Sequence, residues 1–203
     1  MAREADDVVA TYPATGNPEP VTHVRGMLLA SGLGIVRERR LTDRYYSLLS
    51  PEHAAAVSAI VANDWVPLDT TLAHYAAMNE LFPSPDEQVA NGRQVAARVN
   101  ASILGTVISL THAGGATPWT LLKPLPRVIG RLLRGGGLVV RRLGPKESLN
   151  TFLELPIARV PYFCSGLRGM FVAGTELVSR KAYCTEVRSL CTSTTYAFRL
   201  SWV

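Results

Sequence analysis

Three cysteines carry the only thiol chemistry in the chain: Cys164, Cys184 and Cys191. Together with Glu186 they could offer a zinc ion three sulfurs and a carboxylate. The sequence has no C-x-x-C pair, however, and in an extended strand residues 184 and 186 would face one side and residue 191 the other. Three cysteines late in a chain are more typical of buried, reduced thiols than of a disulfide framework. We therefore predict no metal site.

The four histidines, His23, His53, His74 and His112, are well separated. None belongs to an H-E-x-x-H motif or another metal-binding spacing, and only His112, next to Gly114 and Gly115, is predicted to lie in a loop. One of them could serve as a haem ligand. An ordinary buried or surface histidine is the more common case.

Signatures of catalysis are missing from the sequence. It contains no G-x-S-x-G motif, and Ser165 is predicted to lie within a helix rather than on a strained turn. Gly32 and Gly34 have no third glycine in the spacing of a dinucleotide-binding motif. The run Gly135–Gly137 follows a helix instead of preceding one, as a phosphate cradle would. The sequence predicts no enzymatic activity.

A stripe of basic residues stands out between residues 118 and 133, which are predicted to form one amphipathic helix. Lys123, Arg127, Arg131 and Arg134 recur at steps of four, four and three, and no acid occurs between Glu87 and Glu147. The stripe could bind an acidic protein or an anionic membrane surface. Nucleic acid is disfavoured because no aromatic residues alternate with the basic ones. A solvated face neutralised by distant carboxylates is the alternative.

The composition suits one domain with a large apolar interior. The chain has 203 residues, of which 47% are hydrophobic and 18% charged, with a formal net charge of +5. It lacks an uninterrupted apolar run long enough for a membrane span, and its charged start lacks the apolar region of a secretory signal. We expect a cytoplasmic protein. Residues 1–20, rich in proline and acids, predict a flexible arm, and residues 21–203 a single domain.

Helices are predicted over most of the first two thirds of the chain. Residues 21–35 could form a short helix or a strand, and 41–49 a helix. Ser50 and Pro51 mark the start of a helix that runs to about Asn63. Further helices are predicted over 68–81, from 86 to about 110, and over 118–133.

Strands dominate the last third. Residues 138–140 and 150–155 predict two strands, 161–179 a helix, and 182–190 and 195–202 two closing strands. The fold class is therefore α+β: N-terminal helices followed by a four-stranded antiparallel sheet (ββαββ) with one inserted helix. Ser165, Gly169 and Ala173 line one face of that helix, which we expect to lie close to the sheet.

The helices carry more apolar residues than one buried stripe requires. The surplus either fills a large core or forms the wall of a cavity between the helices and the sheet; the sequence leaves both open. If there is a pocket, its candidate lining residues are Tyr75, Met78, Val99, Ile103, Val107 and Phe163.

The end of the chain resembles the vinyl-4-reductase (4VR) domain. The resemblance rests on the segment from Pro161 to Gly169 and on two strands ending at 196–200. That domain belongs to a superfamily with TRAPP-type trafficking subunits and haem-based nitric-oxide sensor domains. The whole chain also resembles a myxobacterial family of unknown function, through motifs at 24–26, 64–67, 135–137, 143–145, 161–163 and Trp202.

The resemblance implies a ligand-binding or scaffolding domain, often a homodimer, with an apolar pocket between helices and sheet. Tyr196 stands near where metal-binding members place a cysteine, and His112 precedes a whole further helix, so we carry over neither zinc nor haem and predict no cofactor. The leading hypothesis is a non-enzymatic sensor that binds an acyl chain or an aromatic molecule. The alternatives are a dimeric, trafficking-type scaffold that uses the basic face and, third, a haem-based gas sensor.

Overall fold

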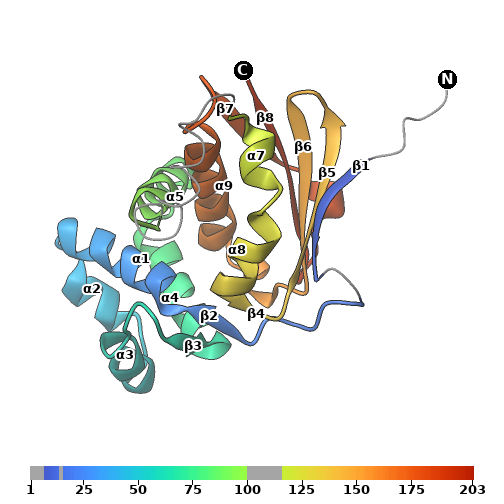
Figure 1. Ribbon diagram of the computed structural model, residues 1–203. Helices are drawn as coiled ribbons and strands as arrows, with labels where there is room; N and C mark the ends of the chain where they lie inside the picture. The colour runs from blue at the N-terminus through green and yellow to red at the C-terminus, as the bar shows by residue number, and fades with distance from the viewer. Residues whose placement is uncertain (1–6, 14–15, 100–115) are drawn as a thin grey trace.

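A five-stranded antiparallel sheet forms one side of the protein, and helices cover one of its faces (Figure 1). The computed structural model describes residues 7–13, 16–99 and 116–203. The strand order is β1-β5-β6-β8-β7, and a second, three-stranded sheet has the order β3-β2-β4. The predicted α+β class is confirmed.

The first half of the chain is mainly helical. Ser50 caps one helix, since its hydroxyl accepts a hydrogen bond from the backbone N–H of His53 at 3.2 Å. That helix ends at Ser58, earlier than predicted. The elements are β2 (His23–Arg25), α1 (Gly26–Glu38), α2 (Thr42–Ser47), α3 (Pro51–Ser58), β3 (Trp65–Pro67), α4 (Leu68–Leu81) and α5 (Pro85–Val99).

The second half of the chain supplies four strands of the large sheet, and one helix is inserted in sequence between the second and third of them. Its elements are α7 (Pro118–Leu122), α8 (Leu125–Leu132), β4 (Leu133–Arg134), β5 (Gly137–Gly144), β6 (Glu147–Leu153), the 3-10 turn η2 (Pro156–Arg159), α9 (Pro161–Thr175), β7 (Ala182–Glu186), η3 (Arg188–Leu190) and β8 (Tyr196–Trp202). The predicted ββαββ segment is therefore β5-β6-α9-β7-β8.

A fifth strand comes from the segment predicted to be a flexible arm. Residues Asp7–Tyr12 form β1, which pairs with β5 in antiparallel register, Thr11 opposite Val139. The free edge of β5 offers backbone donors and acceptors that the β1 backbone satisfies. For residues 7–12 the prediction of an arm is wrong.

The predicted helix over 118–133 is two short helices and a strand. Prolines have no backbone N–H, so Pro124 and Pro126 cannot continue the hydrogen-bond ladder of α7. Lys123 caps α7, α8 begins at Leu125, and Arg134 lies on β4. The basic residues therefore do not form one continuous helical stripe, which corrects that expectation.

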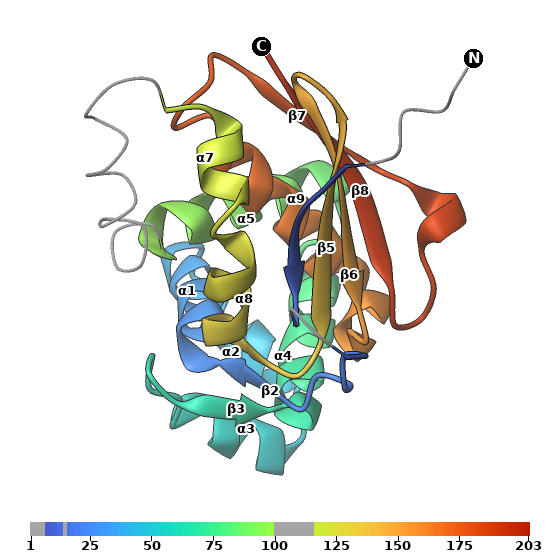
Figure 2. The ribbon, with the colours of Figure 1, turned by 45° about the vertical axis from the view of Figure 1, so that its right-hand side comes forward.

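Helix α9 lies between α5 and the sheet, and its closest backbone contact is with α5 (Figures 1 and 2). A Cβ on Gly92 would come within 3.0 Å of the backbone of Gly166, and one on Gly169 would collide with the backbone of Val89. The smooth face of α9 was predicted to rest on the sheet. Instead, glycines let two helix backbones meet, so that prediction is wrong in its partner.

Candidate functional site

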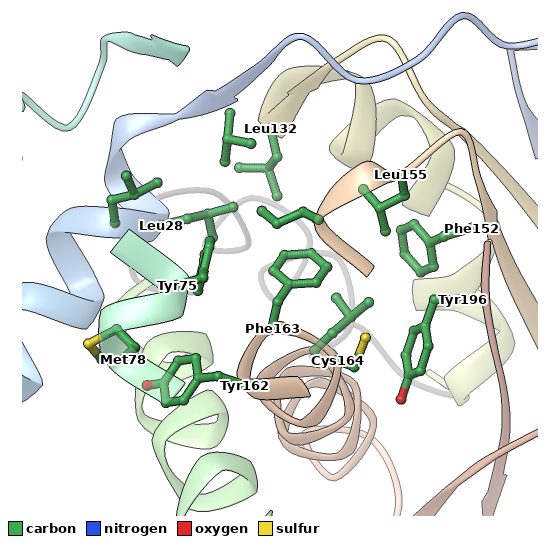
Figure 3. Close-up of a cluster of buried hydrophobic side chains, with 14 of the residues drawn as sticks. Leu28, Tyr75, Met78, Leu132, Phe152, Leu155, Tyr162, Phe163, Cys164 and Tyr196 are labelled. Atoms are coloured by element: carbon green, nitrogen blue, oxygen red, sulfur yellow. The ribbon is translucent and has the colours of Figure 1, made fainter. Parts of the chain in front are cut away.

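A cavity of about 160 Å³ lies among α1, α4, α5, α8, α9 and the inner face of the large sheet. Figure 3 shows part of its wall, with Phe163 between Leu28 and Tyr75 on one side and Phe152 on the other, and Leu132 nearby. Apolar cavities of this size, where they occur in protein cores, stay dry and accept molecules such as benzene.

Each surrounding element supplies mainly apolar side chains to the wall. From α5 come Val95, Ala96 and Val99, and from α9 come Leu167, Met170 and Phe171. The end of α7, the apolar face of α8 and the start of β4 close another side, with Leu121, Leu122, Pro124, Leu125, Val128, Ile129, Leu132 and Leu133.

Glycines help to keep the space open. Gly166 and Gly174 on α9 line the cavity, and a Cβ at either would meet no described atom within 4 Å. Any larger residue at these positions would extend into the open space. At Gly92 the backbones of α5 and α9 approach each other closely, so these two walls of the cavity are in direct contact.

The cavity wall holds no charged residue among the described residues that form it, and its few polar residues are His74, Tyr75, Tyr162 and Thr175. His74 is fully buried, and burial lowers its pKa to about 3. The imidazole is therefore neutral at physiological pH. Burial likewise raises the pKa of Tyr162 to about 12, so its hydroxyl stays protonated.

Of the six residues that the sequence predicted to line a pocket, three line the cavity, one lies elsewhere in the core, and two lie outside the described residues. Tyr75, Val99 and Phe163 line the cavity, and the rings of Tyr75 and Phe163 meet edge to face with centroids 5.2 Å apart. Met78 is fully buried in the core and is not part of the cavity wall. Ile103 and Val107 lie outside the described residues.

Several wall residues were not anticipated. Leu28 and Gly32 come from α1, and His74 from α4. Gly32 lies beside His74: a Cβ there would be 3.0 Å from His74 Nε2. The one available signal in the sequence was that Gly32 and His74 each interrupt an apolar helix face, which marks positions where two helices approach.

The three cysteines lie on α9, on β7 and at the end of η3. Among the described residues no group of three or more histidines, cysteines and acids is placed to hold a metal ion. The thiol of Cys164 is buried and donates to the carbonyl of Ala158 at 3.1 Å, while Cys191 accepts from the N–H of Ala197. Cys184 is half-buried on β7.

The basic residues lie along α7, α8 and β4, with Arg134 alone on the small sheet. Lys123, Arg127, Arg131 and Arg134 are all exposed. The guanidinium of Arg134 lies 4.6 Å from the centroid of the Trp65 ring, and that of Arg25 lies 3.8 Å from the same centroid. Within the described residues, none of the four predicted cations forms an ion pair with a carboxylate.

Comparison with solved structures gives clear matches at low sequence identity. An Fe(II) unliganded H-NOX protein from K. algicida matches with a TM-score of 0.66 and 12% identity, covering 88% of this chain and 96% of that one. The fold is that of the H-NOX domains. An oxygen-binding H-NOX domain related to soluble guanylate cyclases matches with a TM-score of 0.55 and 11% identity, covering 87% and 92% of the two chains.

A structure from work on haem distortion in the H-NOX family matches with a TM-score of 0.59 and 11% identity, covering 88% of this chain and 94% of that one. No protein-family model matches the sequence, and no curated protein does. The expected resemblance to haem-based nitric-oxide sensor domains is thus supported at the level of the fold. The described helices include none that is long and apolar enough to cross a membrane.

The described residues do not fit haem. Haem is far larger than benzene, and a cavity of about 160 Å³ compares with those that admit a single benzene ring. His74 is the only histidine in the described wall, and it has no exposed surface from which to reach an iron atom. Among the described residues of the wall there is also no arginine or lysine to pair with the two carboxylates of haem.

Proposed function

We propose that this protein is a non-enzymatic sensor domain that binds a small apolar molecule between its helices and its sheet. The observation that carries the proposal is the cavity of about 160 Å³, whose described wall is almost wholly apolar and carries no charge. Burial of an apolar molecule there is driven by removing its surface from water. The likeness of the fold to haem-binding H-NOX domains supports a ligand site in this part of the fold.

The size of the cavity favours an aromatic ring or a short acyl chain over a long fatty acid. A ligand of this kind would contact α5, α8, α9 and the sheet at once. Binding to the folded state alone stabilises it in proportion to the logarithm of ligand concentration. The bound molecule could then report to the rest of the domain through α8 and α9, which border both the cavity and the sheet.

Native mass spectrometry of the protein purified from its host tests the proposal, together with thermal shifts across a panel of lipids and small aromatics. We expect a bound mass, or a rise in melting temperature for at least one small aromatic or short-chain member. A protein with neither would refute the proposal.

Two substitutions at one position sharpen this test. Gly166→Leu places a side chain in the open space and should abolish the ligand-induced shift. Gly166→Ala, the matched control, makes the same change from glycine but adds only a methyl group, and it should retain binding. Equal ligand shifts in the two variants would place the ligand elsewhere.

A haem-based gas sensor is the second candidate, favoured by the fold that the chain shares with H-NOX proteins and by the unpartnered ring nitrogen of His74 near the cavity. The size and charge of the described wall speak against it. Absorption spectroscopy decides: purified protein with no Soret band after haem is added excludes this candidate.

A dimeric scaffold that binds an acidic partner or membrane is the third candidate. Its support is the set of exposed cations Lys123, Arg127, Arg131 and Arg134, which form no ion pair with a carboxylate within the described residues. Arg131→Glu with Arg134→Glu should abolish binding to an acidic partner or to anionic vesicles and leave the melting temperature unchanged. Unchanged binding would exclude this surface, and analytical ultracentrifugation tests the homodimer.

A further inference from the structure

Strand β1 docks on the large sheet with little buried surface. None of its six residues is buried, whereas each of the other four strands of the sheet has at least one buried residue. Within the described residues β1 pairs with β5 alone, and its register shifts between Val8 and Ala10. Elements with few buried contacts open at a smaller free-energy cost than the core does. β1 is therefore the strand of this sheet that is most easily released.

Tyr12, the last residue of β1, packs against helix α8. The two elements lie side by side (Figure 2), and the ring of Tyr12 rests on Gly130. A Cβ on Gly130 would lie 3.0 Å from Cε2 of that ring and 3.3 Å from its hydroxyl oxygen. Any side chain at position 130 would therefore push the ring away from the helix. The contact needs both the glycine and the docked strand.

Helix α8 lies between this contact and the cavity. Its residues that line the cavity are Leu125, Val128, Ile129 and Leu132, and Gly130 is not among them. With 3.6 residues per turn, Gly130 lies nearly opposite the centre of the lining face. The helix therefore touches the cavity on one side and Tyr12 on the other.

The chain that follows β1 fixes the C-terminal end of α8. The N–H of Gly136 donates to the carbonyl of Glu19 at 2.6 Å, and the N–H of Thr22 donates to the carbonyl of Arg134 at 2.9 Å. At the other end Pro124 interrupts the helical ladder between α7 and α8. Between these ends Tyr12 supports the helix, and this support is lost when β1 is released.

We propose that β1 is a releasable strap that regulates the cavity: the docked strand and a molecule in the cavity stabilise each other through α8. This inference rests on the proposed function and names the regulation of the same site. With Tyr12 in place, α8 presents its apolar face to the ligand, and release of β1 loosens that wall. Because the coupling between two sites is reciprocal, a bound ligand must in turn hold β1 on the sheet.

Hydrogen–deuterium exchange measures the effect of a ligand on β1. Benzene is the probe, because dry apolar cavities of this size accept it. We expect saturating benzene to slow the exchange of the amides of residues 8–12 at least about fivefold, the lower end of typical coupling between sites. The internal control is β7, the opposite edge of the same sheet, which supplies no residue to the described wall and should keep its exchange rate. Unchanged or faster exchange in β1, or equal slowing in both strands, would overturn the proposal.

Calorimetry with benzene measures the reciprocal effect. Tyr12→Ala removes the ring that rests on α8 and leaves the described cavity wall unchanged. It should weaken benzene binding by up to the factor found for exchange, about fivefold, because one coupling free energy sets both effects. Thr11→Ala, the matched control, truncates the neighbouring exposed residue of β1 and should bind benzene as the wild type does. Wild-type affinity in Tyr12→Ala, or equal weakening in the two variants, would refute the route through Tyr12.

Failure of the strap and failure of the ligand site give different results. If benzene binds but β1 does not respond to it, the strap is refuted while the proposed function stands. If benzene does not bind but another member of the panel does, that member replaces it in both measurements. If no member of the panel binds, the proposed function falls, and this inference with it. If Tyr12→Ala does not fold, the exchange of β1 in the wild type decides.

Discussion

The close crossing of α5 and α9 predicts that Gly92→Ala lowers the stability of the folded protein. In an isolated helix, alanine is favoured over glycine by about 1 kcal/mol. In this protein the added Cβ would come within 3.0 Å of the backbone of Gly166, and a carbonyl in a helix cannot rotate aside as a side chain can. The two helices must separate instead, and α9 also forms a wall of the cavity.

The magnitude follows from the balance of the two effects. Overpacking a core costs about 1–3 kcal/mol, and occasionally more, when side chains share the strain. Because the blocked atoms here belong to the backbone, we expect the upper end of that range, which leaves a net loss of about 2 kcal/mol after the helix preference is subtracted. For a domain of this size that loss corresponds to a fall in melting temperature of about 4–8 °C.

Gly166→Ala provides the matched control on the facing helix. The substitution is the same, but its Cβ meets no described atom within 4 Å, so the helix preference should act alone and raise stability by about 0.5–1 kcal/mol. Urea unfolding followed by circular dichroism measures both variants, with unchanged m-values as evidence that the unfolding reaction is the same. A Gly92→Ala protein as stable as the wild type would refute the close backbone contact.

Three further predictions concern single residues. Ser50→Ala removes the cap of α3 and should lower the free energy of unfolding by about 1 kcal/mol, whereas Ser58→Ala at the other end of the same helix should change it by less than about half of that. Burial lowers the pKa of His74 to about 3, so between that pH and about 6.5 the unfolded chain binds a proton that the folded chain does not. The wild type should therefore lose about 1.4 kcal/mol of stability per pH unit below pH 6.5 relative to His74→Phe, and parallel pH profiles in urea titrations would contradict the burial of a neutral imidazole. Burial raises the pKa of the Cys164 thiol to about 12, so at pH 8 iodoacetamide should modify Cys164 at least about a hundredfold more slowly than it modifies a free cysteine, as followed by peptide mass spectrometry.

Local patterns were sufficient for much of the fold. The cap and proline at Ser50 and Pro51 and the alternation in β8 each act within a few residues, and both elements are present, although α3 ends before its predicted bound. The same holds for α4, whose apolar spacing gave its bounds of Leu68–Leu81. The class of the fold follows from the order of these elements along the chain.

Two of the failures involve partners distant in sequence, and a third is local. Nothing in residues 7–12 shows that the edge of β5 is free to receive them. Small residues on α9 indicate a close approach, but only the position of Gly92 shows that the neighbour is α5 rather than the sheet. Pro124 and Pro126 were visible in the sequence, and their effect on the helix was underestimated because the apolar spacing continues across them.

The cavity was predictable only as one of two possibilities. Apolar surplus in the helices could have filled the core, and whether it does depends on how closely six elements approach one another. His74 is the clearest example, because its position on α4 gives no sign that one ring nitrogen pairs with Tyr45 while the other, beside Gly32, is buried without a hydrogen-bond partner.

A crystal structure determined under xenon pressure tests the central claim most directly, because xenon enters dry apolar cavities of this size. The account predicts xenon density between α5, α8 and α9, beside Phe163 and Leu167. Side chains that fill this space, or ordered water molecules within it, would contradict an apolar ligand site in this protein.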